Sequence, residues 1–597
     1  MWRFSCACPA AAGVFVLALM LATQLCARPQ AQATGIEGGQ TNPSADGDVV
    51  QGTVVNRVTH EPVARALVFA PDDRFAVLTD DRGRFEFKFP PRDGTAPPNQ
   101  APSDDPEQVQ AQQRALQIWF ARNSHFETFF ARKPGYLALE HETRSTTNSR
   151  PAGPMIIELE PEARITGLVQ LPDADGVERG QIQIYRQEFQ EGQPSWRMVD
   201  TVKIRANGEF RFAELPAGTY KLFTLEQMER IPPIFNARSQ LFGYPPVYFP
   251  NSKDFASAMP IHLAAGATFE GNISLVRREY YPVRIEVSGA SSQGGVSLAV
   301  YQQGRPGPGY ELGFDPGEGA IRGFLPDGSY TLKLSLQQDQ GSSGVLNFTV
   351  RGGPVDGLAV ALVPNISLAV KVKTDFQRAE TSEGQGVVRN GTIRIRNGEV
   401  GIVLRPVDSF ELARPFQAEE IPANPDGELT ILNIVPGSYR VQIFSPNSYA
   451  ASATWGGTDL LRHPMVVGTD GAGTPMEVEL RDDGAEVSGT VREPGHDNLP
   501  GAKDVAPPPG NATVYFVPTG DSEGQLRSIR TTENGQFALS QIPPGTYRLL
   551  AFPTEQKNLD LLNPVEMRKY ESKGIVLQLA PDQRETLQAP LTLVDEP

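Results

Sequence analysis

The feature that most constrains this chain is a phrase that it repeats. The stretch "GEFRFAELPAGTYKLF" begins at Gly208, and "GQFALSQIPPGTYRLL" begins at Gly535, more than three hundred residues later. Both place apolar residues at alternate positions, then proline and glycine, then a tyrosine. A phrase repeated at this distance indicates a repeated structural unit, so we expect an array of similar units.

The chemistry of the phrase predicts two strands joined by a turn. Phe537 and Leu539 alternate with Gln536, Ala538 and Ser540, the period of two of a strand with one buried face. Pro544 fixes φ and removes a backbone donor, and Gly545 accepts a positive φ. Alternation resumes at Tyr547. These signals predict a β-hairpin whose tyrosine fills the core beside the turn.

The same frame occurs at other places along the chain. In the copies that end at Tyr220, Tyr439 and Tyr547, the tyrosine lies twelve positions after the leading glycine. A looser copy that ends at Tyr330 is one residue shorter. An N-terminal copy at 83–90 keeps the first strand but loses the tyrosine turn to an insertion. Five copies predict five units.

A strand-like opening precedes each copy. The five openings are "VVQGTVVN", "ARITGLVQ", "YPVRIEVS", "ISLAVKVK" and "AEVSGTVR". An opening, its phrase and a closing strand span about 85 to 120 residues, a usual size for one all-β domain. We therefore expect an all-β chain, a tandem array of about five small antiparallel β-sandwich domains. Their expected ranges are 49–160, 161–277, 278–364, 365–481 and 482–597.

The first and last units resemble the carboxypeptidase regulatory-like domain. The first reads "GTVVNRVTHEPVARALVFA" and then "LTDDRGRFEFKFP", and the last carries Gly489, Val491, Pro500, Phe537 and "PPGTY". The resemblance implies a small β-sandwich of transthyretin-like topology, which is also similar to starch-binding-like domains. Joining stretches such as "WGGTDLLRHPMVV" resemble those of large secreted proteins of Gram-negative bacteria.

The N-terminus predicts export. Arg3 precedes an uncharged run that is richest at "GVFVLALMLA", and small residues follow at Ala31 and Ala33. We interpret residues 1–33 as a secretory signal peptide and 34–48 as a linker, with an uncleaved membrane anchor as the alternative. No membrane span is expected after the signal peptide. The expected location is the periplasm, the cell surface or the extracellular space.

The cysteines and the charge limit what the exported chain can do. Cys6, Cys8 and Cys26 all lie inside the N-terminal segment, so the domains are expected to hold without disulfides. The formal net charge is −16 at pH 7, which argues against nucleic acid as a partner.

Two segments depart from the β pattern. Helix formers near 104–122 follow Asp105 as an N-cap and Pro106 at the first helical position, so a helical insertion in the first domain is expected. The stretch "LLNPVEMRKYES" in the last domain is a second helical candidate.

No motif in the sequence assembles an enzyme. The six histidines are scattered, with no HExxH or close His/Glu pair, so we expect no metal site, no cofactor and no catalytic residue. The carboxypeptidase name therefore brings no zinc site. Gly520-Asp521-Ser522-Glu523-Gly524 satisfies GxSxG, but a hydrolase elbow needs a following helix and a later histidine, and His496 lies upstream. We interpret this stretch as a loop.

The aromatic residues leave one alternative open. Trp119, Trp196, Trp455 and Tyr244 are candidates for stacking on sugar rings if they are exposed on a rigid sandwich. Two hypotheses follow. The chain is a non-enzymatic exported scaffold or interaction module with envelope proteins as partners, or it binds polysaccharide through one or two domains. An exposed coplanar aromatic pair favours the second, and inward-pointing rings favour the first.

Overall fold

A computed structural model gives the fold of this 597-residue protein. It describes residues 49–70, 76–88, 112, 114, 129–137, 155–171, 180–190, 192–229, 240–289, 296–336, 341–377, 393–395, 398–407, 416–417, 428–468, 473–492, 512–519, 524–532, 534–587 and 591–592. The expected signal peptide and linker lie outside these residues. So does most of the expected helical insertion, of which Gln112 and Arg114 are described and helical.

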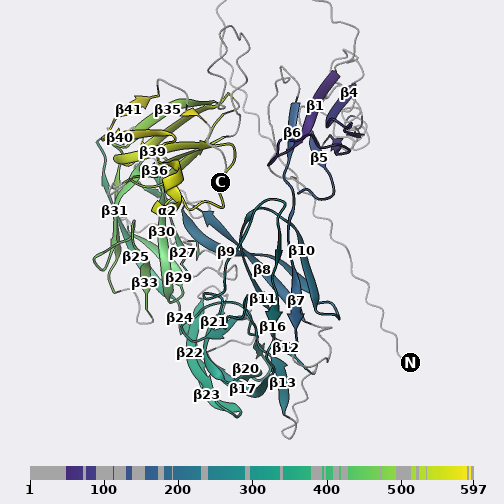
Figure 1. The fold of residues 1–597 in the computed structure, drawn as a ribbon. Helices are drawn as coiled ribbons and strands as arrows, with labels where there is room; N and C mark the ends of the chain where they lie inside the picture. The colour runs from purple at the N-terminus through teal and green to yellow at the C-terminus, as the bar shows by residue number, and fades with distance from the viewer. Residues whose placement is uncertain are drawn as a thin grey trace, which may run out of the picture.

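The described strands form β-sheets that stack in five pairs along the chain (Figure 1). We call these pairs the first to fifth sandwich. In the first, the sheets are β4(Arg84–Lys88)-β1(Val49–Asn56)-β6(Met155–Leu159) and β3(Ala76–Leu78)-β2(Leu67–Phe69)-β5(Phe130–Arg132). In the second, they are β10(Glu209–Leu215)-β7(Ala163–Gln170)-β15(Thr268–Glu270), with β16(Ile273–Ser274) beside β7, and β14(Ile261–Leu263)-β11(Gly218–Thr224)-β8(Gln181–Gln190)-β9(Gln193–Lys203).

The third and fourth sandwiches have wider sheets. The third contains β12(Gln227–Met228)-β13(Leu241–Tyr244)-β17(Arg278–Ser288)-β20(Ala320–Pro326)-β19(Gly313–Asp315), with β23(Val355–Ala361) beside β17, and β18(Val296–Gln302)-β21(Gly328–Leu336)-β22(Ser342–Val350)-β24(Val363–Pro364). The fourth contains β29(Glu428–Ile434)-β25(Ile366–Asp375)-β34(Met476–Arg481)-β31(Tyr449–Trp455)-β32(Thr458–Asp459), and β26(Ile393–Ile395)-β27(Gly398–Pro406)-β30(Gly437–Phe444)-β33(Met465–Val467) with β28(Phe416–Gln417) beside β27.

The fifth sandwich adds the helical turn that the sequence predicted. Its sheets are β38(Gln536–Ile542)-β35(Ala485–Arg492)-β41(Arg584–Thr586), with β42(Leu591–Thr592) beside β35, and β37(Arg527–Arg530)-β36(Thr513–Pro518)-β39(Gly545–Phe552)-β40(Ile575–Leu579). The helix α2(Pro564–Met567) runs into the 3-10 turn η1(Arg568–Tyr570). The Asn563 side chain caps α2 by accepting from the Val565 N–H.

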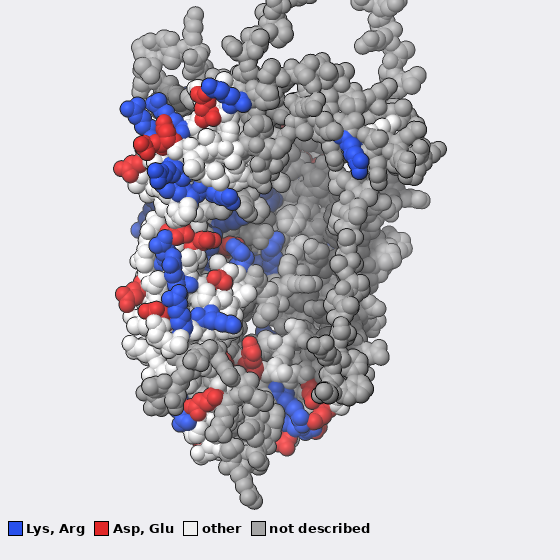
Figure 2. Space-filling model, turned by 90° about the vertical axis from the view of Figure 1, so that its right-hand side faces the viewer, with Lys and Arg blue, Asp and Glu red and all other residues white. Residues whose placement is uncertain are grey.

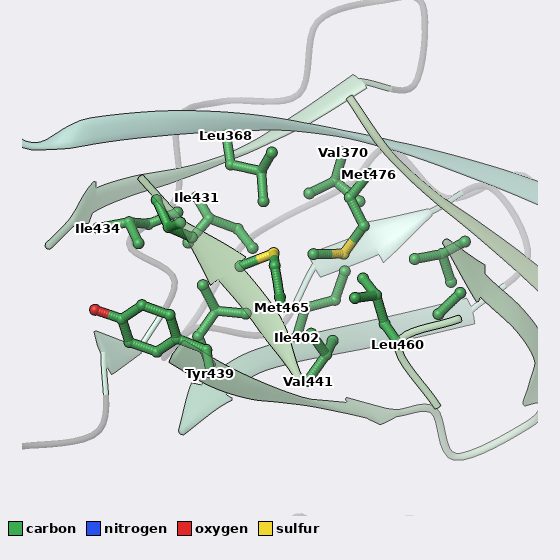
Figure 3. Close-up of a cluster of buried hydrophobic side chains, with 14 of the residues drawn as sticks. Leu368, Val370, Ile402, Ile431, Ile434, Tyr439, Val441, Leu460, Met465 and Met476 are labelled. Carbon is green, nitrogen blue, oxygen red and sulfur yellow. The ribbon is translucent and has the colours of Figure 1, made fainter. Parts of the chain in front are cut away.

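Each sandwich encloses its own hydrophobic core. In the fourth, Leu368, Ile402, Ile431, Met465 and Met476 from both sheets meet between the layers (Figure 3). All are at most 2% exposed. Separate clusters of this kind fill the other four sandwiches. The prediction of an all-β tandem array of sandwiches is therefore confirmed.

We expected antiparallel sheets, but the structure also contains parallel strand pairs. In each sandwich the opening strand is central, and it pairs antiparallel with the first strand of the repeated phrase. In the same sheet it pairs parallel with a closing strand, β6, β15, β23, β34 or β41. A parallel neighbour requires the chain to cross over the core before it returns, so one sheet of every sandwich is mixed.

The repeated phrase is also not a hairpin. Its two strands do not pair with each other: β38 pairs with β35, whereas β39 pairs with β36 and β40 in the facing sheet. The same holds for β10 and β11, β20 and β21, and β29 and β30. The proline–glycine turn carries the chain from one sheet to the facing sheet. We call this turn the arch. The prediction of a strand, a turn and a second strand was correct, but the prediction that these two strands pair with each other was wrong.

A tyrosine closes each arch. Tyr220, Tyr330, Tyr439 and Tyr547 are at most 3% exposed, which confirms the expectation that they fill the core. Each hydroxyl donates a hydrogen bond of 2.5–2.9 Å to the carbonyl oxygen four residues earlier. Gly545 has φ 154°, so the positive φ predicted for it is present. The ring and its hydrogen bond hold the two sheets at a fixed corner.

The face in Figure 2 carries lysine and arginine side chains interspersed with aspartate and glutamate. Among the described residues, no helix is long and apolar enough to span a membrane.

Candidate functional site

The most elaborate polar site in the described residues lies at the junction of the second and third sandwiches. The chain leaves β11 of the second sandwich at Thr224 and enters β12, which pairs with β13. β13 in turn pairs with β17 of the third sandwich. Two strands from the range expected for the second domain therefore extend a sheet of the third.

An aromatic cluster forms the second sandwich's side of this junction. Tyr185, Phe223, Tyr248 and Phe255 are at most 5% exposed. Phe223 stacks on Tyr248 with ring centroids 5.1 Å apart, and Phe255 meets Tyr185 edge-on at 5.3 Å. Such edge and stacked contacts add to the hydrophobic gain of burying the rings.

A glycine-rich loop of the third sandwich packs against this cluster. A Cβ at Gly307 would lie 2.7 Å from Phe255 Cβ, and one at Gly309 would lie 2.7 Å from the Tyr248 hydroxyl. Gly309 has φ 131°, a conformation that side chains disfavour. The Tyr248 hydroxyl donates a hydrogen bond to the Pro308 carbonyl. Close approach of this loop therefore requires glycine at both positions.

Two charged side chains are buried at the edge of the cluster. Lys221 Nζ donates to the carbonyl oxygens of Phe255 at 2.7 Å and Ala256 at 3.1 Å, and it lies 4.9 Å from the Trp196 ring centroid. Burial lowers the pKa of Lys221. Asp254 pairs with Arg305 of the third sandwich. Burial opposes ionisation of Asp254, but hydrogen bonds from Ser257 and Arg305 outweigh it and lower its pKa.

Glu226 is the most perturbed acid at the junction. Burial raises the pKa of its carboxyl to about 8, and the facing Tyr280 hydroxyl offsets this only in part. The Glu311 N–H lies 3.4 Å from Oε2, while Oε1 has no hydrogen-bond partner. Burial between two sandwiches therefore favours the neutral form of the Glu226 carboxyl.

The arrangement joins two bodies. Its hydrogen bonds, ion pair and ring contacts run between the second and third sandwiches or brace the loops that meet there. Among the described residues, no group of three or more His, Cys, Asp or Glu side chains is placed to hold a metal ion. The junction therefore fixes the two sandwiches to each other and contains one carboxyl whose pKa is raised by burial.

The three aromatic candidates that the structure describes belong to different hydrophobic clusters. Trp119 lies outside the described residues. Tyr244 is 4% exposed in the second core, so its buried ring cannot serve as a platform, which corrects that expectation. Trp196 is half-buried and meets Phe255 edge-on at 5.5 Å. Trp455 is half-buried on the fourth core and donates from Nε1 to the Thr474 carbonyl at 2.9 Å.

Sequence reasoning missed Lys221, Glu226 and Asp254. A signal was present, because Lys221 and Glu226 flank the mostly apolar run 222–225 and occur close in sequence to the aromatic residues within 242–249. A charge inside an apolar strand is rarely buried unless it has a partner. The partners, however, are backbone carbonyls and residues of the next sandwich, which the sequence does not place.

No family model matches the chain, and no curated protein matches it. Solved structures similar to it include a streptococcal ancillary pilin, 13% identical over 53% of this chain and 100% of that one, with a TM-score of 0.14. The Bacillus anthracis TIE protein is 10% identical over 92% and 99%, with a TM-score of 0.13. BcpA, the major pilin subunit of Bacillus cereus, is 10% identical over 72% and 98%, with a TM-score of 0.12. At these values the likeness carries no inference about this chain.

Proposed function

We propose that this protein is an exported, non-enzymatic scaffold or interaction module in which the second sandwich is held in a fixed orientation to the third, and the fourth to the fifth. The observation that carries the proposal is the interlocked junction of the second and third sandwiches, where strands, an ion pair and a glycine loop cross between them. Contacts between domains of one chain are often sparse and allow motion. Burial of Asp254 and Tyr248 in such a contact favours a rigid joint.

The joint between the fourth and fifth sandwiches supports the same proposal. Asp483 is 2% exposed and accepts a hydrogen bond of 2.9 Å from the Tyr449 hydroxyl of the fourth sandwich. Its carbonyl accepts from Asp582 N–H at 2.6 Å in the fifth. Gln525 Nε2 of the fifth sandwich donates to the Ala450 carbonyl of the fourth at 2.9 Å. Buried hydrogen bonds of this kind are costly to break when no other partner replaces them.

The finer parts of the proposal come from the sequence. Residues 1–33 would act as a cleaved signal peptide, the five domains would follow the ranges given above, and the first and last would be carboxypeptidase regulatory-like. The partners would be other proteins of the envelope. Export is tested by cell fractionation, because full-length protein retained in the cytoplasm with its N-terminus intact would contradict it.

Rigidity is tested by double electron–electron resonance on the full chain, with Cys6, Cys8 and Cys26 replaced by serine. Spin labels at Leu168→Cys and Val345→Cys, both on exposed strand positions, report the distance between the second and third sandwiches. A single narrow distance distribution is expected. A broad distribution would overturn the scaffold proposal.

Variants connect that rigidity to the junction. Tyr248→Phe combined with Arg305→Ala removes the hydrogen bond to Pro308 and the ion pair to Asp254, so the distribution should broaden. Arg322→Ala is the matched control. It removes only exposed ion pairs within the third sandwich, to Asp315 and Glu318, and should leave the distribution narrow.

A further inference from the structure

The hairpin β8–β9 reaches beyond its own sandwich. Its strands pair from Gln181↔Lys203 to Gln190↔Gln193, so the turn lies at the far end of a long ribbon. Figure 1 shows this ribbon running from the second sandwich toward α2 of the fifth. A two-stranded ribbon that projects from its sheet needs contacts at its tip to be held in place.

The tip is in contact with the fifth sandwich. Phe189 N–H donates to the Lys557 carbonyl at 2.7 Å. Gly192, with φ 73°, lies under two leucines: a Cβ there would be 2.6 Å from Leu562 Cδ1 and 3.2 Å from Leu526 Cδ2. Nearby, Asn558 Nδ2 donates to the Ala217 carbonyl at 3.3 Å, across 341 positions of sequence. The contact thus combines backbone bonding with apolar packing.

The remaining junctions complete a circuit. The second sandwich is joined to the third by Asp254–Arg305, and the fourth to the fifth by Tyr449–Asp483. The third is joined to the fourth by Gly341 N–H, which donates to Asn433 Oδ1 at 3.0 Å. With the hairpin contact, each of sandwiches two to five touches two others, and the chain between Phe189 and Lys557 forms a closed ring.

We propose that the β8–β9 hairpin is a reversible latch that closes sandwiches two to five into this ring. The latch is more open to solvent than the junctions at Asp254 and Asp483, because several of the residues that meet the tip on the fifth sandwich are exposed. Leu562 is 40% exposed, and Lys557 and Asn558 are exposed, whereas Asp254 and Asp483 at the other junctions are at most 4% exposed. Regions with few buried contacts open at lower free energy than cores do. Opening would free the hairpin tip and the leucines beneath it.

Disulfide trapping tests closure directly. In a full chain with Cys6, Cys8 and Cys26 replaced by serine, the pair Gly192→Cys/Leu562→Cys is oxidised, and a second pair, Phe189→Cys/Lys557→Cys, guards against poor geometry at one site. We expect at least one pair to form a disulfide within one chain, seen as a monomer of altered mobility on a non-reducing gel. Failure of both pairs, or only disulfide-linked dimers, would overturn the intramolecular latch.

Opening is tested with a matched pair of variants. Leu562→Asp places a charge against Gly192, while Val565→Asp places the same charge three residues later at a position that is 65% exposed. Spin labels at Arg211→Cys and Val576→Cys measure the distance between the second and fifth sandwiches. Leu562→Asp should broaden or lengthen the distance distribution relative to the parent chain, and Val565→Asp should not. Equal distributions in both variants would show that the contact does not hold the ring.

Discussion

At the scale of single residues, the arch tyrosines explain why the phrase is repeated. Each ring is buried, and each hydroxyl donates to a carbonyl four residues earlier. For Tyr220, Tyr439 and Tyr547 the carbonyl belongs to the turn that crosses between the sheets, outside any strand, whereas for Tyr330 it belongs to Pro326, the last residue of β20. A buried carbonyl without a donor is costly, and the tyrosine supplies that donor. Proline, glycine and tyrosine therefore form one structural device.

Tyr547→Phe should destabilise the fifth sandwich by about 1–2 kcal/mol, because a buried carbonyl and an amide lose their partner. The hydroxyl donates to Pro543 O at 2.7 Å and accepts from Gln525 N–H at 3.2 Å. Hydrogen–deuterium exchange of peptides covering β38 and β39 measures the local change. The control is Tyr281→Phe, whose hydroxyl bonds only to the half-buried side chain of Glu279. Equal protection in both variants would contradict the role of the bond.

At the scale of elements, the repeated phrase contains a second device that turn chemistry does not indicate. Glu214, Asn433 and Gln541 have φ of 54°, 61° and 55°, and each lies six residues before an arch tyrosine. The strand register shifts at the same points. One extra residue in a left-handed conformation is a β-bulge, which bends the strand toward the arch.

The bulge also explains the shorter copy. The third sandwich pairs β17 with β20 without a register shift, and its phrase is one residue shorter before Tyr330. The twelve-residue spacing of the other copies is thus the length of a regular strand plus a bulge. The spacing was visible in the sequence, but its meaning required the register.

Glu214→Gly should stabilise the second sandwich by up to about 1 kcal/mol, because glycine adopts a positive φ without the cost that a side chain incurs. Glu214 is exposed and its side chain makes no described hydrogen bond or ion pair, so little else is lost. Arg211→Gly, at an exposed and regular position of the same strand, should instead destabilise by a similar amount. Urea unfolding curves of both variants give the sign of the change in the free energy of unfolding. If both variants are less stable than the parent chain, the bulge explanation is wrong.

At the scale of the whole molecule, the junction of the second and third sandwiches links stability to pH through Glu226. Its pKa of about 8 in the folded protein lies above the value of roughly 4.3 for an exposed glutamate. The neighbouring tyrosines Tyr248, Tyr280, Tyr310 and Tyr330 have raised pKa values and stay neutral in that range. Glu311, which also faces Glu226, adds repulsion to its ionised form.

The contribution of neutral Glu226 to the free energy of unfolding is fully present below pH 4 and is lost as the pH rises through about 8. The total loss is at most about 5 kcal/mol. Glu226→Gln should flatten the fall in Tm between pH 5 and 9, measured by calorimetry on the full chain. Glu318→Gln, on the exposed face of the third sandwich, should keep the parent slope. An unchanged slope in Glu226→Gln would remove Glu226 as the source.

Local sequence patterns were enough to predict the strands, the five units and the buried tyrosines. Alternation at Phe537 and Leu539 and turn chemistry at Gly545 depend only on neighbours in the chain, so they can be recognised without a structure. The prediction that Tyr244 stacks on sugar was wrong because strand alternation shows which residues share a face. It does not show whether another part of the chain buries that face.

How these elements combine depends on contacts between distant parts of the chain. Whether two strands around a proline–glycine turn pair with each other or cross to facing sheets depends on which distant strands bury their apolar faces. The partners of Lys221, Glu226 and Asp254, and the contact of Gly192 with Leu562, likewise join segments far apart in the chain. The free energies of these contacts come from burial and from pairing across sandwiches. No local sequence pattern indicates either contribution.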